Sequence, residues 1–160
     1  MKKPEDFGIK NYSFDDKGFL NVTGDVDLED KRLKKIPFKF GVVSGGFYCS
    51  WNQLENLEGS PTTVGGSFIC SENQLTSLEG CPSTVSGDFY CYSNQLKSLE
   101  GCPSTVGGDF NIDNTKELRD SLRKMFKGWK FKSKTVADML KESLSISISL
   151  KYMMTLVDEK

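Results

Sequence analysis

Three consecutive segments read FYCSWNQLENLEGSPTTVGGS (residues 47–67), FICSENQLTSLEGCPSTVSGD (68–88) and FYCYSNQLKSLEGCPSTVGGD (89–109). Phenylalanine, asparagine, leucine, proline and valine each return at an interval of 21 residues, and degenerate copies flank these segments on both sides. A fixed interval of this length, held in many columns at once, is the sequence signature of a solenoid. Each repeat is then one coil, and neighbouring coils bury a shared core.

The repeat continues upstream in degenerate form over residues 25–44. Counting back 21 residues places Val26 under Phe47 and Leu28 under Cys49. Residues 1–24 precede it, and two β-favouring segments there flank the turn Asp15–Gly18. We expect this part to form a β-hairpin cap, because the first coil of a solenoid would otherwise expose its apolar end.

Each full repeat contains one recognisable strand. Phe47 and Cys49 alternate with Tyr48 and Ser50, a period of two that predicts one pair facing the core and the other facing outward. The limb that follows Asn52 contains a Glu-Gly turn and a proline, and it is too short for a helix of ordinary length. The sequence therefore predicts a parallel sheet with one strand from each repeat.

The spacing Phe47-x-Cys49-x-x-Asn52-x-Leu54, with its copies, resembles the later part of the leucine-rich repeat over residues 25–115. The first apolar position of that pattern is not matched. The repeat motif Asn-Gln-Leu-x-x-Leu-Glu-Gly-x-Pro is similar to that of leucine-rich-repeat-like proteins encoded by bacteriophages. This resemblance implies that the column asparagines (Asn52, Asn73 and Asn94) form a ladder of hydrogen bonds to buried backbone groups. It also implies a phage protein that binds and inhibits or diverts a host protein, with a defence component as one candidate.

The apolar pattern changes after Asn114. The spacing of Leu118, Leu122 and Met125 predicts an amphipathic helix, and a second, shorter helix is expected to end near Lys141. Residues 144–152 alternate between apolar and polar side chains, which favours a strand but leaves a helix open. The sequence thus predicts an α+β protein, with a hairpin cap (1–24), a leucine-rich-repeat-like solenoid (25–115) and a C-terminal helical cap or small module (116–160).

Composition argues against several classes of protein. A formal net charge of −1 is that of an ordinary soluble protein, and no apolar run approaches the roughly 20 residues of a membrane span. The five cysteines, placed by the repeat, favour a reducing, cytoplasmic compartment, which is the host cytoplasm if the protein is phage-encoded. The chain has no histidine, which removes histidine-based catalytic triads and histidine metal ligands. We expect no enzymatic activity, no cofactor and no metal.

The five cysteines are expected to be structural. Cys49, Cys70 and Cys91 occupy one column whose neighbouring places are Leu28 and Ile112, so the column offers three thiols where zinc requires four ligands. Cys81 and Cys102 lie in turns beside glutamates, without a basic neighbour that would lower the thiol pKa.

The outward positions of the predicted sheet gather large aromatic and acidic side chains. Tyr and Trp dominate protein-binding hot spots, so we expect a partner-binding site on a concave aromatic and acidic face. Its residues are Tyr48, Ser50, Trp51, Ile69, Glu72, Asp88, Tyr90, Tyr92, Asn111 and Asp113. The alternative for this face is intramolecular cover by the C-terminal segment.

Three other functions remain open at this point. A small molecule or signalling nucleotide could be trapped against the tyrosines, although acidic neighbours disfavour phosphates. Residues 116–134 carry eight basic and two acidic side chains and could contact nucleic acid, whereas residues 45–115 carry one lysine and eight acids. Self-assembly, including a homodimer through the C-terminal segment, is the third alternative.

Overall fold

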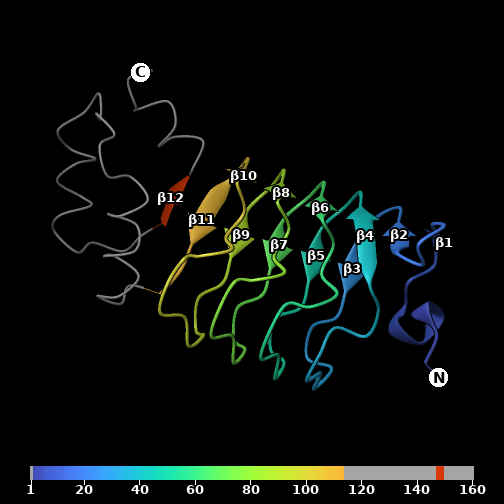
Figure 1. Ribbon diagram of the computed structural model, residues 1–160, viewed down its shortest axis with the longest axis horizontal. Coiled ribbons are helices and arrows are strands. Elements are labelled where there is room, and N and C mark those ends of the chain that lie inside the picture. Colours follow the sequence, from blue (N-terminus) through green and yellow to red (C-terminus); the bar gives the residue numbers. More distant parts are fainter. Residues whose placement is uncertain (1, 114–146, 150–160) are drawn as a thin grey trace, which may run out of the picture.

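A computed structural model describes residues 2–113 and 147–149 of the chain. This part winds as a parallel β-solenoid, in which each coil of 21 residues adds one short strand to each of two sheets (Figure 1). The coils stack in register, so that the residues paired in succession along one sheet are Val26, Phe47, Phe68, Phe89 and Phe110. The parallel solenoid predicted from the 21-residue interval is confirmed.

Two six-stranded sheets form the walls of the solenoid. The first, sheet A, has the order β1 (Tyr12–Phe14), β2 (Leu20–Val22), β4 (Phe40–Val43), β6 (Thr63–Val64), β8 (Thr84–Val85) and β10 (Thr105–Val106). The second, sheet B, has the order β12 (Ser147–Ser149), β11 (Asp109–Asn111), β9 (Phe89–Tyr90), β7 (Phe68–Ile69), β5 (Phe47–Tyr48) and β3 (Val26–Asp27). The prediction of a single strand in each repeat was wrong, because the Thr-Val pair of each repeat forms a second strand.

The second strand follows from the valine column and the glycine-rich corner after it. Val43, Val64 and Val85 are fully buried, so this limb must face the core. The corner that leads to the next strand of sheet B brings backbones of neighbouring coils into contact. A Cβ on Gly66 would lie 2.7 Å from the backbone nitrogen of Gly46, which explains why the corner cannot carry a side chain there.

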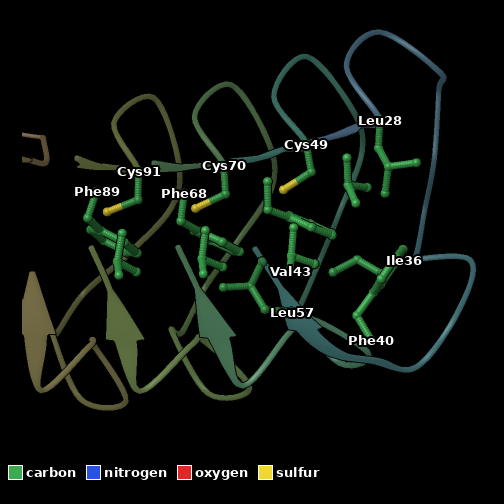
Figure 2. Close-up of a cluster of buried hydrophobic side chains, with 14 of the residues drawn as sticks. Leu28, Ile36, Phe40, Val43, Cys49, Leu57, Phe68, Cys70, Phe89 and Cys91 are labelled. Atoms are coloured by element: carbon green, nitrogen blue, oxygen red, sulfur yellow. The ribbon is translucent and has the colours of Figure 1, made fainter. Parts of the chain in front are cut away.

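The core between the sheets is made of stacked columns of identical or similar side chains (Figure 2). The phenylalanine rings of sheet B stack nearly parallel, with centroids 5.5 Å apart between Phe47 and Phe68 and 5.9 Å apart between Phe68 and Phe89. The cysteine, leucine and valine columns fill the rest of this interior. The core is therefore complete without the tyrosine and tryptophan side chains of sheet B.

The predicted asparagine ladder is confirmed. The Asn73 side chain accepts a hydrogen bond from the backbone N–H of Leu54 (3.0 Å) and donates to the carbonyls of Cys49 (3.0 Å), Cys70 and Ser71 (both 3.1 Å). Asn52 and Asn94 make equivalent bonds one coil before and one coil after it. Each asparagine thereby satisfies backbone groups of two coils at the bend where sheet B ends.

The N-terminal end carries the expected hairpin. A 3₁₀ turn, η1 (Pro4–Phe7), precedes the antiparallel pair β1 and β2. The turn between the two strands is held by the Asp15 carboxylate, which accepts from the backbone N–H groups of Lys17 and Phe19 (both 2.9 Å). Strand β1 is confined to Tyr12–Phe14, and Ile9 before it is buried at the edge of the core.

At the other end, β12 pairs antiparallel with β11 and extends sheet B (Figure 1). Residues 147–149 are thus strand, as the alternation of residues 144–152 favoured. The helices predicted after Asn114, and with them the helical cap or module, lie outside the described residues. Within residues 2–113 and 147–149, η1 is the only helical turn, so the α+β class is reduced there to a β-solenoid.

Candidate functional site

The outer face of sheet B displays an unbroken column of five side chains, one from each parallel strand. Pairing of β3, β5, β7, β9 and β11 aligns Asp27, Tyr48, Ile69, Tyr90 and Asn111. Trp51, Glu72 and Tyr92 lie at the strand ends beside this column. We call these eight residues the tyrosine face.

The tyrosine face is exposed because the strand alternation directs phenylalanine inward. Phe47, Phe68 and Phe89 are fully buried, whereas the next residue in each strand is only half-buried. Trp51 is 62% exposed and Tyr92 is 37% exposed, and both are among the most exposed large hydrophobic side chains of the described part. The prediction that phenylalanine points inward while tyrosine and tryptophan point outward is confirmed.

Ser50 was predicted to lie on this face, and the structure places it elsewhere. Ser50 and its repeat neighbour Ser71 are buried, with exposed fractions of 2% and 1%. The strand alternation ends here, because Trp51 and Glu72 adopt left-handed φ values of 58° and 55° that turn the chain into the asparagine bend. A serine side chain at this bend is too short to emerge, whereas Tyr92 in the same column reaches the surface.

Several acidic side chains beside the tyrosines accept hydrogen bonds from backbone amides of the neighbouring coil. The Asp25 carboxylate accepts from Gly46 N–H (2.7 Å), and the Asp88 carboxylate accepts from Asp109 N–H (2.8 Å). Ser67 takes the same place in the intervening coil and accepts from Asp88 N–H (3.0 Å). This corner ladder was not foreseen from the sequence, where Asp88 was predicted only as a partner-binding residue.

Asp113 also has a structural role. Its two carboxylate oxygens accept from the backbone N–H groups of Ser93 (2.7 Å) and Asn94 (3.1 Å). In the preceding coil the equivalent amides of Glu72 and Asn73 donate to the backbone carbonyls of Tyr92 and Ser93. The Asp113 carboxylate thus replaces the carbonyls that a further coil would supply. The half-buried Asn111 and Glu72 remain beside the tyrosines as predicted.

The tyrosines lie in a negative electrostatic environment. Burial, followed by the nearby charges of Asp25 and Glu29, raises the pKa of Tyr48. Burial, followed by Asp88 and Asp109, likewise raises the pKa of Tyr90. Both phenols are therefore neutral at physiological pH, and the carboxylates near them repel anions.

The cysteines have the environment of core residues. Cys49, Cys70 and Cys91 are fully buried, and burial is the main cause that raises the pKa of each thiol. Burial also raises the pKa of the turn residues Cys81 and Cys102, which is the opposite of the shift that activates a nucleophile. Among the described residues, no three histidine, cysteine or acidic side chains are grouped so that they could hold a metal ion.

Sheet A has an outer face that the sequence reading did not single out. In-register pairing aligns Val42, Thr63, Thr84 and Thr105, and Val42 is 48% exposed. The only signal for this column was the Thr-Val pair that closes each repeat. This column contains no aromatic side chain, and it serves below as the reference face for experiments.

No protein-family model, no curated protein and no solved structure matches the chain. Within the part of the chain that the structure describes, no helix has the length and apolar character needed to cross a membrane. The basic segment 116–134, the basis of the nucleic-acid alternative, lies outside the described residues.

Proposed function

We propose that this chain is a non-enzymatic binding protein that captures another protein on its tyrosine face. The observation that carries the proposal is the column Tyr48, Ile69 and Tyr90, aligned and partly exposed on a solenoid whose core is complete without it. Large amphipathic rings that the fold does not need for its own core are the side chains that most often dominate protein interfaces.

The solenoid supports this function because its binding surface is formed before the partner arrives. The tyrosine face lies on strands whose backbones are fixed by the asparagine ladder on one side and by the corner ladder on the other. Association then requires little ordering of backbone, and the binding free energy is reduced less by lost conformational entropy than for a flexible segment.

The biological setting is a further proposal that rests on the resemblance of the repeat to bacteriophage proteins. In that setting the chain would bind a bacterial host protein and inhibit or divert it. The carboxylates beside Tyr48 and Tyr90 argue against a phosphate-bearing small molecule as the ligand, because like charges would be brought together.

The proposal is tested by capture from bacterial lysate with two matched double variants. Tyr48→Ala/Tyr90→Ala truncates the tyrosine face, and Thr63→Ala/Thr84→Ala truncates the reference face on sheet A. We expect the tyrosine variant to lose the captured protein while its melting temperature stays close to that of the wild type, since both rings are outside the core. Capture that survives the tyrosine variant, or that is lost equally in the threonine variant, would refute the proposal.

A further inference from the structure

Carboxylates lie near both ends of the aromatic column. Asp27 occupies the column itself, next to Tyr48. The charges of Asp25 and Glu29 contribute to the raised pKa of Tyr48, near one end of the column. Those of Asp88 and Asp109 contribute to the raised pKa of Tyr90, near the other end. The negative charge is therefore distributed along the face instead of being gathered in one cluster.

These charges have no basic partners within the described part of the chain. Asp25, Asp27 and Asp88 accept hydrogen bonds from backbone N–H groups, and Asp88 also accepts one from the Tyr90 hydroxyl. These neutral donors leave the full negative charge in place. Residues 45–113 contain one basic side chain, Lys97, in the loop after the Asn94 bend. The bases of the first coil, Lys31, Arg32, Lys34 and Lys35, follow strand β3 in the loop and do not enter the column.

We propose that the segment bound by the tyrosine face is a cationic, extended stretch of the partner protein, rich in arginine or lysine. This inference rests on the proposed function and specifies its ligand. The flat surface of a tyrosine ring attracts a cation that lies within about 6 Å of the ring centroid, and arginine is more often the cation than lysine. The carboxylates near each ring then supply acceptors for the guanidinium or ammonium N–H groups.

The dimensions of the column fit a short peptide that runs along the solenoid axis. Neighbouring strands lie about 4.8 Å apart, so the four steps from Asp27 to Asn111 span about 19 Å. An extended chain advances about 3.3 Å per residue, so about six residues cover the column. Side chains on alternate residues would meet the face about every 6.6 Å, so cations at alternate positions can reach Asp27, Tyr48 and Tyr90.

The test measures the affinity of the full chain for a synthetic nine-residue peptide of alternating arginine and serine, by isothermal titration calorimetry at low salt. Asp27→Asn/Asp88→Asn/Asp109→Asn removes three charges from the face, and asparagine keeps the side-chain oxygen that accepts backbone N–H groups at positions 27 and 88. Glu58→Gln/Glu79→Gln/Glu100→Gln removes the same charge from the exposed turns.

We expect the aspartate variant to bind the peptide on the order of 100-fold more weakly, from about fivefold for each contact between unit charges near 4 Å in water. The glutamate variant should stay within about twofold of the wild type, and a peptide with glutamate in place of arginine should not bind. The tyrosine variant Tyr48→Ala/Tyr90→Ala should also weaken binding, which locates the peptide on this face.

Equal weakening of peptide binding in the aspartate and glutamate variants would overturn the inference, because binding would then depend only on the net charge of the protein. A peptide that fails to bind the wild-type chain overturns it as well, whether the face is occupied by the chain's own basic residues 116–134 or by a second copy. If the lysate partner is lost in the tyrosine variant but retained in the aspartate variant, the cationic ligand is wrong while the proposed function stands.

Discussion

Asn73 provides the sharpest test of how the coils are held together, through replacement by alanine. Its side chain is buried and makes four hydrogen bonds to backbone groups of two coils. The substitution leaves the buried N–H of Leu54 without this acceptor, at a cost of roughly 1–3 kcal/mol, and removes a donor from three carbonyls. Together these losses predict a fall in the free energy of unfolding of about 3 kcal/mol.

The assay is urea unfolding monitored by far-ultraviolet circular dichroism, which gives the free energy of unfolding. For a chain of this size a loss of about 3 kcal/mol corresponds to a melting temperature lower by roughly 6–12 °C. Gln74→Ala is the matched control, because Gln74 is the next residue along the chain and is exposed. The control should change the free energy of unfolding by less than about 0.5 kcal/mol, as is usual for surface substitutions.

The reasoning is refuted if Asn73→Ala and Gln74→Ala unfold at the same urea concentration. Such a result would mean that the backbone groups at the bend find other partners without cost. Asn94→Ala should lie between the two, because its side chain is only half-buried and its longest bond, to the carbonyl of Tyr92, measures 3.3 Å.

Three further outcomes follow from the same structure. Phe68→Ala should cost about 3–5 kcal/mol in a urea titration because the ring is fully buried between two others, whereas Phe14→Ala, at 57% exposure, should cost far less. Ser71→Ala should be neutral or slightly stabilising by thermal melting, because it removes a buried hydroxyl without a hydrogen-bond partner among the described residues. Burial raises the thiol pKa of Cys70, so the unfolded chain releases this proton near pH 8.5 while the folded chain retains it. Stability should therefore fall above that pH, and Cys70→Ala should reduce the slope by about 1.4 kcal/mol per pH unit.

The sequence could predict the solenoid, its register and the inward phenylalanines because these features repeat at a fixed interval. A period of two residues distinguishes Phe47 from Tyr48 without any knowledge of the second sheet. The asparagine ladder was predicted from the resemblance of the repeat to the leucine-rich repeat, which assigns this role to the column of Asn52, Asn73 and Asn94.

Other features carried no usable signal in the sequence. The strands of sheet A contain only two residues in most coils, which is too short for alternation to be recognised. The burial of Ser50 depends on the left-handed backbone of Trp51, and tryptophan is not a residue type that favours this conformation. Likewise, nothing in the composition distinguishes an aspartate that binds a partner from one that, like Asp88, accepts a backbone N–H.

Site-specific photocrosslinking tests most directly whether the partner lies on the tyrosine face. A photoreactive phenylalanine analogue is placed at Ile69, in the middle of the column, and in a second protein at Thr84, on the outer face of sheet A. After irradiation in bacterial lysate, we expect a single crosslinked product from position 69, which disappears when Tyr48→Ala/Tyr90→Ala is added, and none from position 84. A product that forms from position 84 but not from position 69 would contradict the account.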